Sequence, residues 1–236
     1  MRKLIVKILE KAGLYLPLVN LWNRWKHRKM ARSVRKHGLD TLISMDEAFT
    51  EMGAQMFLVY GTLLGAYRNH DFIPYDFDLD VGVLAGTLPD NYQSIILKHG
   101  FHFVRQDYIK ENGFVIVETY EKNGVGIDIY YTLTNNDDTF GIYCARKHEF
   151  KEWRSANATD GFPVECQIVD KCEFVRSNFL GHDFYMPEKV TDWLRDMYTE
   201  TYMTPIKNFD ETTTKRRVIF PIEFRSYRNY ELNKPR

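Results

Sequence analysis

Three aspartates alternate with apolar residues in the segment DFDLDVGV, residues 76–83, and this pattern constrains the fold more than any other feature of the chain. Successive side chains of a β-strand point to opposite faces, so a strand here places Asp76, Asp78 and Asp80 on one face. The other face then carries Phe77, Leu79, Val81 and Val83. Two carboxylates ~4–7 Å apart repel each other by roughly 2–4 kcal/mol at an effective dielectric constant near ~20. A bound divalent cation reverses that cost, so the pattern predicts Mg²⁺ or Mn²⁺ at this strand.

A glycine turn and a short helix precede the aspartates. The apolar run MFLVY, residues 56–60, is typical of a buried strand. Gly61 and Thr62 follow it directly, before the helical segment LLGAYRN that contains Arg68. Backbone N–H groups at such a turn and at a helix N-terminus bind phosphate oxygens. Gly61 lies seventeen residues before Asp78, and this combination is how nucleotidyltransferase-fold enzymes hold a di- or triphosphate through a metal.

Three more strands are predicted after the aspartates. Residues 101–106, 114–120 and 125–133 are rich in Val, Ile, Phe and Tyr and are separated by turn residues. Asp128 lies on the third of these strands and supplies a fourth carboxylate. A single carboxylate on a strand also commonly pairs with Lys or Arg, and that alternative stays open.

Together with the remaining segments, these elements predict the α+β fold class. We expect a nucleotidyltransferase-like mixed β-sheet flanked by helices, with a basic N-terminal helical segment and a C-terminal helical appendage. The pattern predicts helices over 3–16, 18–37, 41–53 and 88–99, strands over 139–144 and 164–169, a hairpin over 172–186, and a helix after Met186 with Pro187 in its first turn. We divide the chain into the basic segment 1–39, a catalytic domain over 40–206 and a C-terminal extension over 207–236.

The basic segment contrasts with the rest of the chain. Residues 1–40 contain eleven Lys and Arg residues against Glu10 and Asp40, although the formal net charge of the whole chain is zero. Apolar and aromatic residues beside a cationic stretch are typical of a helix on an anionic membrane surface. A solvated basic face packed on the domain is the alternative. Nucleic-acid binding is not expected, because no nucleic-acid-binding motif accompanies the charge.

The same segment bears on the compartment. Lys7, Glu10 and Lys11 interrupt the first apolar stretch, so a secretory signal is not expected, and no stretch approaches the ~20 apolar residues of a spanning helix. Three cysteines, an odd number, fit a reducing compartment. We therefore expect a cytoplasmic protein, peripheral on the inner face of the membrane.

The stretch YGTLLGAYRNHDFIPYDFDLDVGV resembles the core motif of the LicD family, GTLLGAxRxxxxIPWDDDxDI. The resemblance continues through GIDIYY and, more weakly, through FLGHDFYMPEKVTDWLRDMYTETYMTP, and covers roughly residues 40–206. It implies a transferase that moves a phospho-alcohol group, such as phosphocholine or phosphoribitol, from a CDP-linked donor. The acceptor implied is a hydroxyl of a cell-surface glycan or glycolipid, as in lipopolysaccharide, teichoic acid or capsule, and CMP is released.

Position by position, the resemblance assigns roles to residues of the motif. Asp78 and Asp80 are the implied metal ligands, and Asp128 is a third carboxylate that bridges a second metal or acts as base on the acceptor hydroxyl. Gly61, Thr62 and Arg68 are the implied contacts of the donor's phosphates. The family's middle aspartate is Phe77 in this chain, which makes Asp76 a secondary candidate for substrate binding. Arg68 has an alternative role in closing its helix.

Sulfur and imidazole ligands raise a separate question. Cys144, His148, Cys166 and Cys172 supply four soft ligands of the kind that tetrahedral Zn²⁺ prefers, and a zinc-binding loop occurs in the LicD family. Their spacing matches no recognised zinc motif, so reduced, unlinked cysteines and a surface histidine are the alternative.

Two other functions remain open at this stage. The same site serves a nucleotidylyltransferase that transfers a nucleotide and releases pyrophosphate. A non-catalytic, membrane-docked scaffold or glycan-binding protein is the other class. The donor head group, the acceptor and the oligomeric state do not follow from the sequence.

Overall fold

The computed structural model describes residues 15–145, 161–206, 216–220 and 225–231. Most of the predicted helix over 3–16 lies outside these ranges, and so does the candidate ligand His148. The described helices are α2 (Tyr15–Glu51), α3 (Tyr60–Asn69), α4 (Tyr92–Lys98) and α5 (Val190–Tyr198). The described strands are β1 (Met56–Leu58), β2 (Asp78–Leu84), β3 (His102–Ile109), β4 (Val115–Lys122), β5 (Val125–Thr134), β6 (Thr139–Ala145), β7 (Phe162–Asp170), β8 (Phe174–Phe179), β9 (His182–Pro187), β10 (Arg217–Ile219) and β11 (Arg225–Asn229).

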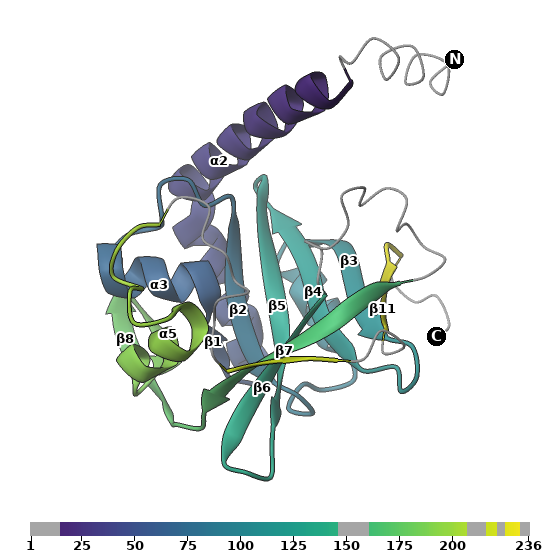
Figure 1. The fold of residues 1–236 in the computed structure, drawn as a ribbon, viewed down its shortest axis with the longest axis vertical. Coiled ribbons are helices and arrows are strands. Elements are labelled where there is room, and N and C mark those ends of the chain that lie inside the picture. Colours follow the sequence, from purple (N-terminus) through teal and green to yellow (C-terminus); the bar gives the residue numbers. More distant parts are fainter. Residues whose placement is uncertain (1–14, 146–160, 207–215, 221–224, 232–236) are drawn as a thin grey trace.

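These strands form one mixed sheet, which confirms the predicted fold class. The path runs β10-β7-β11-β3-β4-β5-β2-β1-β9-β8, and β6 joins β5 to β7. The pairs β2–β5 and β1–β9 are parallel, whereas the others are antiparallel. Because β11 pairs with both β3 and β7, the strands β3, β4, β5, β6, β7 and β11 close into a ring. Figure 1 shows β7 crossing in front of β5 and β4.

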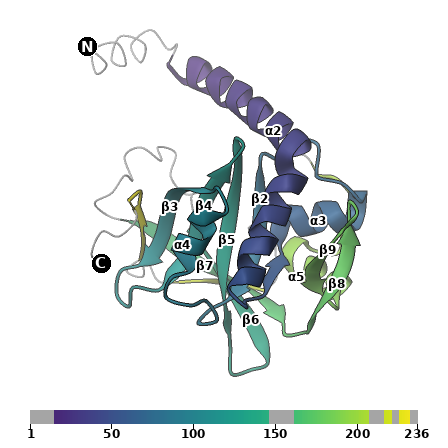
Figure 2. The same cartoon turned by 180° about the vertical axis from the view of Figure 1, so that it is seen from behind.

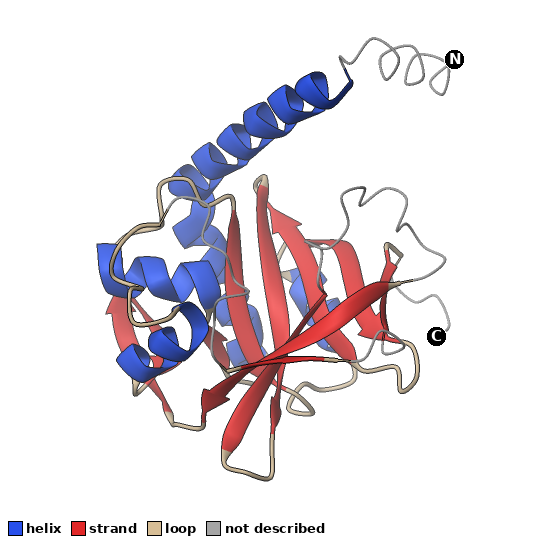
Figure 3. Cartoon of the chain, in the orientation of Figure 1, coloured by secondary structure: helices blue, strands red, loops and turns tan. Residues whose placement is uncertain are grey.

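Helices cover both faces of the open part of the sheet (Figure 3). α2 and α4 lie on one face of the sheet, which Figure 2 shows from behind. α3 and α5 lie side by side on the opposite face, next to β2 and β1 (Figure 1). The core between these layers contains the apolar positions of β2, namely Leu79, Val81 and Val83, none of which is exposed. The predicted alternation is therefore confirmed from Asp78 onward. Asp76 and Phe77 precede the strand, and Phe77 lines the pocket and stacks on His27, where the sequence placed it on the core face.

α2 is one continuous helix where two were predicted, over 18–37 and 41–53. The expected break falls at Gly38, a residue that usually favours helix ends. Here Gly38 lies on the packed side of the helix, where an added Cβ would come within 3.1 Å of the Phe72 ring. The glycine thus permits close packing instead of ending the helix. Buried residues at helical spacing, such as Val34, Leu42 and Met45, continue across the expected break.

The C-terminal part of the chain differs most from the prediction. The helix after Met186 begins at Val190, because Pro187 ends β9 by pairing with Phe174 of β8. The described residues beyond 206 add strands β10 and β11 to the sheet, where a helical appendage was expected. Within the described ranges, no helix combines the length and the apolar character needed to span a membrane.

Candidate active site

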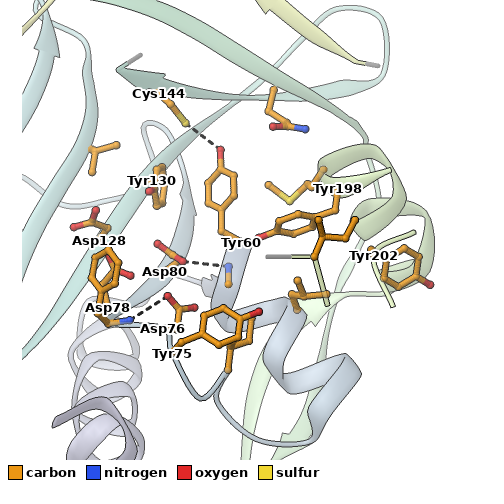
Figure 4. A pocket seen from close by; sticks show the side chains of 18 of the residues that line it. Tyr60, Tyr75, Asp76, Asp78, Asp80, Asp128, Tyr130, Cys144, Tyr198 and Tyr202 are labelled. Atoms are coloured by element: carbon orange, nitrogen blue, oxygen red, sulfur yellow. Dashed lines mark hydrogen bonds between the residues drawn. The ribbon is translucent and has the colours of Figure 1, made fainter. Parts of the chain in front are cut away.

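The aspartates predicted on neighbouring strands lie together at one pocket (Figure 4). β2 and β5 pair in parallel with Asp80 opposite Asp128, and Asp78 opposite Gly126. Residues opposite one another on adjacent strands point to the same face of the sheet. Asp80 and Asp128 are 8% and 7% exposed, so both carboxylates sit at the base of the pocket and not on an open surface.

The N-terminus of α3 meets this face of β2. The Gly61 N–H donates to Oδ2 of Asp80 over 3.2 Å. The Thr62 hydroxyl accepts the backbone N–H of Asp80 over 2.8 Å, and Thr62 is itself buried. A glycine suits position 61, because an added Cβ would collide with the Asp76 carboxylate as it is placed here. Gly61 and Thr62 therefore fix the acidic strand in place, and phosphate binding by them stays a prediction.

Burial and the neighbouring carboxylates raise the proton affinity of Asp80. Burial, and then the negative charges of Asp78, Asp76 and Asp128, raise the pKa of Asp80 well above its ordinary value, opposed by the Gly61 N–H. Burial also raises the pKa of Asp76, while the Phe77 N–H that donates to it acts in the opposite direction. Such a group of carboxylates is stabilised by a cation.

Asp128 has strong partners of its own. Its Oδ2 accepts from Arg105 over 2.9 Å, and its Oδ1 accepts a short hydrogen bond from the Thr119 hydroxyl. Arg105 also donates to Asp107 over 2.7 Å, and Arg228 of β11 holds Asp107 through two further bonds of 2.6 and 2.7 Å. The structure thus gives Asp128 the arginine partner that the sequence left as an alternative.

Sequence reasoning did not identify Arg105 and Asp107 as pocket residues, although both line the pocket. The same period-two pattern could have found them, because residues 105 and 107 lie two positions apart on β3; the predicted strand, however, ended at residue 106 and left Asp107 out. Arg228 carried no comparable signal, since its segment shows no regular period.

Arg68 lies in the last turn of α3 and lines the pocket. Its NH1 donates to the carbonyl of Tyr202 over 3.1 Å, and its Nε donates to the Asn69 side chain over 2.8 Å. The guanidinium therefore joins α3 to the segment after α5. Its predicted contact with phosphate stays a prediction.

The rest of the pocket is strongly aromatic. It has a volume of about 530 Å³, and the tyrosines on its walls are Tyr60, Tyr75, Tyr130, Tyr198 and Tyr202. Tyr60 has a φ of 43°, which is uncommon for a residue with a side chain. Its ring lies 4.7 Å from that of Tyr130, and its hydroxyl lies 3.0 Å from the Cys144 sulfur. The pocket therefore has acidic side chains at its floor and aromatic walls that suit a flat ring or a sugar.

The described cysteines do not converge on a zinc site. Cys144 pairs with Glu165 and Cys166 pairs with Tyr143 in the β6–β7 ladder, so the two cysteines point to opposite faces. Burial raises the pKa of the Cys166 thiol to about 12, which disfavours the thiolate that zinc requires. Cys172 packs against the apolar core. The predicted zinc site gains no support from the described residues, and its fourth ligand lies outside them.

The donors in the acidic pocket do suit a hard cation. Within the described parts of the chain, no three His, Cys, Asp or Glu side chains form a ready-made metal cluster. Mg²⁺ commonly takes one or two carboxylates and completes its shell with water and substrate phosphates. Asp78 and Asp80 fit that mode of binding, because they are oxygen donors on one strand face and the charge of Asp80 is disfavoured without a cation.

Two comparisons with known proteins bear on this site. Residues 53–165 match the family described as LicD/FKTN/FKRP, nucleotidyltransferase domain. The chain is also similar to ribitol-5-phosphate transferase FKTN from Mus musculus, with 24% identity over 184 residues, which cover 75% of this chain and 35% of that protein. The chain thus spans about a third of the length of this relative. The matched family range contains α3, β2 and β5, which carry the acidic pocket.

Proposed function

The chain belongs to the LicD/FKTN/FKRP family, and on that basis we propose that it is a metal-dependent phosphotransferase. It transfers a phospho-alcohol group from a CDP-linked donor to a hydroxyl of a glycan or glycolipid and releases CMP. The observation that carries the proposal is the parallel register of β2 and β5, which brings Asp80 beside Asp128 at the N-terminus of α3. The named relative acts on ribitol 5-phosphate, which supports a phospho-polyol as one donor class besides phosphocholine.

The donor's diphosphate fits the acidic floor of the pocket. Asp78 and Asp80 hold Mg²⁺ or Mn²⁺, which neutralises phosphate charge when it is bound. Arg105 and Arg68 both line the pocket, and a guanidinium offers a planar pair of donors to phosphate oxygens. We assign Arg105 to the charge that develops on the departing CMP, and Arg68 to the phosphate that is transferred.

The reaction is an in-line displacement. The acceptor oxygen attacks the phosphorus distal to cytidine, the bond from that phosphorus to the CMP oxygen breaks, and the hydroxyl proton passes to a pocket carboxylate. The resemblance implies that Asp128 acts as the base or bridges a second metal, but one oxygen of Asp128 accepts a bond from Arg105 and the other from Thr119. We assign the proton to Asp76, because its carboxylate also lines the pocket and burial raises its pKa.

The proposal also concerns location. A glycan acceptor built on a lipid carrier keeps the enzyme at a membrane surface, and we propose the cytoplasmic face, where CDP-linked donors are available.

Product analysis tests the proposal. The purified chain is incubated with CDP-choline, CDP-ribitol or CDP-glycerol and Mg²⁺, and CMP is measured with water as the acceptor. We expect CMP from at least one donor, and loss of at least a hundredfold in Asp78→Asn and Asp80→Asn. Asp90→Asn, an exposed aspartate elsewhere, is the matched control and keeps the wild-type rate.

Two results would overturn the assignment. One is CMP release at the wild-type rate in Asp80→Asn. The other is pyrophosphate release from CTP with no CMP from any of the three donors, which would favour the nucleotidylyltransferase.

A further inference from the structure

Four exposed apolar side chains form a stripe on the outer half of α2. Leu18, Leu21, Trp22 and Trp25, here called the outer stripe, are 50%, 64%, 60% and 55% exposed. Their spacing of three, four and seven residues places them on one face of a helix. The two indole rings lie 5.2 Å apart. Contiguous exposed apolar side chains of this size mark an interaction surface.

The part of the domain that the structure describes does not cover this stripe. The packed side of α2 contains Ala31, Val34 and Met45, all buried. At about 100° of rotation per residue, the outer stripe lies roughly 170° from that packed side. Figures 1 and 2 show the outer half of α2 extending away from the sheet. The stripe therefore faces away from the described part of the protein.

A row of cations continues the same face toward the domain. Lys29, Arg32 and Lys36, here called the basic row, are exposed and follow the outer stripe at helical spacing. The Lys29 ammonium lies 5.8 Å from the centre of the Trp25 ring. The sequence from residue 15 to residue 39 contains no Asp or Glu. The face is thus apolar at its outer end and cationic for the next three turns.

We propose that this face of α2 docks on an anionic phospholipid bilayer. Trp and Leu side chains bury in the boundary between headgroups and acyl chains, and Lys and Arg lie at the level of anionic headgroups. The order along α2 matches that layering, with the outer stripe inserted and the basic row at the surface. The axis of α2 therefore enters the bilayer at an angle, with its N-terminal end deepest.

The helix that docks also contacts the pocket, from the side opposite the outer stripe. On the inner side of α2, the His27 ring stacks on Phe77 with centres 4.5 Å apart and planes 11° apart. Phe77 stands between Asp76 and Asp78, and Tyr75 beside it is 64% exposed at the pocket wall. The helix that docks is thus in contact with the acidic segment of the pocket. A lipid-linked acceptor follows from this contact only if the proposed function holds, whereas docking itself does not depend on it.

Vesicle binding tests the docking surface. The full chain is sedimented with vesicles of phosphatidylcholine alone and with vesicles that also contain phosphatidylglycerol. We expect binding to the anionic vesicles that falls with added salt. Each Lys or Arg near an anionic surface contributes roughly fivefold, so Lys29→Gln with Arg32→Gln and Lys36→Gln lowers the partition coefficient roughly a hundredfold. The double variant Trp22→Gln with Trp25→Gln loses at least roughly tenfold.

Matched variants keep the test specific. Leu97→Gln with Ile219→Gln removes two exposed apolar side chains elsewhere, and Lys110→Gln with Lys171→Gln and Lys189→Gln removes three exposed cations; both sets bind as the wild type does. Tryptophan emission shifts to shorter wavelength on anionic vesicles in the wild type and not in the double Trp variant. CMP release without vesicles stays unchanged in that variant, which separates docking from catalysis.

Three outcomes would overturn the proposal: no binding of the wild type to anionic vesicles, equal losses in the control variants, or a wild-type dimer in solution that the double Trp variant abolishes. The last outcome would assign the outer stripe to a second copy of the chain.

Discussion

At the scale of single residues, Asp80 shows a conflict between stability and the proposed function. Its carboxylate is 8% exposed and faces three other carboxylates, so its charge costs the metal-free protein free energy. The backbone around it is well anchored, through the Thr62 hydroxyl and the Gly61 N–H. A structural role alone would favour a neutral side chain at this position, whereas cation binding requires the charge.

We predict that Asp80→Asn raises the melting temperature of the metal-free protein at neutral pH by a few degrees, corresponding to roughly 1 kcal/mol. The asparagine oxygen still accepts the Gly61 N–H, while the repulsive charge is gone. Calorimetric melting with a chelator measures this change, and excess Mg²⁺ should stabilise the wild type alone. Lower stability of the variant without metal would contradict the account.

The same pKa shift predicts a dependence on pH. The pKa of Asp80 is raised in the folded state, whereas in the unfolded chain an aspartate has a pKa of about 4. The folded protein therefore binds a proton at Asp80 more tightly than the unfolded chain does. Protonation as the pH falls through the raised value therefore stabilises the metal-free wild type. The advantage of Asp80→Asn should shrink as the pH falls from neutral toward about 4. Urea unfolding at several pH values checks the trend, and a growing difference would contradict it.

Two glycines of α3 should respond differently to an added methyl group. In Gly61→Ala the Cβ meets the end of the Asp76 side chain, which can rotate away from the pocket. In Gly65→Ala the Cβ meets the backbone, with the Asp71 carbonyl at 2.8 Å and the Ile73 nitrogen at 3.2 Å. We expect Gly61→Ala to lose activity while its stability changes by less than about 1 kcal/mol, and Gly65→Ala to lose roughly 1–3 kcal/mol. Chemical denaturation and CMP release distinguish them, and the reverse pattern would refute the assignment.

At the scale of elements, β11 supports the site from behind its lining, through Arg228 and Asp107. It closes the ring by pairing with β3 and β7, and its Arg228 holds Asp107, which in turn holds Arg105 toward Asp128. Asp107 is 2% exposed, so its charge depends on these two arginines.

We predict that Arg228→Met costs about 3 kcal/mol of stability, because it removes two bonds from a buried carboxylate. Arg225→Met on the same strand is the control, since the bond that the Arg225 side chain makes to the Gly161 carbonyl is a long one of 3.5 Å. We expect it to cost less than about 1 kcal/mol. Denaturant unfolding measures both, and equal losses would show that the clamp on Asp107 is not stabilising.

Local patterns predicted the central elements well and their joints less well. The alternation of residues 76–83 and the turn residues before β4 and β5 are short-range signals, and the strands appear where these signals lie. The break in α2 and the helix start at Pro187 were wrong, because packing against Phe72 and pairing with β8 override the local preference of Gly and Pro. β10 and β11 were missed because their strand character comes from pairing with distant partners.

At the scale of the whole molecule, the pocket depends on contacts that no local pattern contains. Arg228 and Asp107 are separated by 121 residues, and Arg68 and Tyr202 by 134. The sequence predicted the carboxylates at the floor of the pocket, since Asp78, Asp80 and Asp128 lie on strands with a clear period-two alternation. It did not predict the arginine and tyrosine walls, since these require the ring of strands and the return of the chain after α5. Motif residues therefore indicated the chemistry, and the topology supplied its surroundings.

The central claim is that the carboxylates of β2, beside the N-terminus of α3, bind a diphosphate only together with a divalent cation. Calorimetric titration of CDP, the part shared by all the proposed donors, tests it most directly when it is done with Mn²⁺ and with a chelator. The account predicts binding to the wild type and to Asp90→Asn with Mn²⁺, none with the chelator, and a loss of at least roughly a hundredfold in Asp80→Asn. Equal affinity for CDP with and without the cation, or in Asp80→Asn, would contradict it.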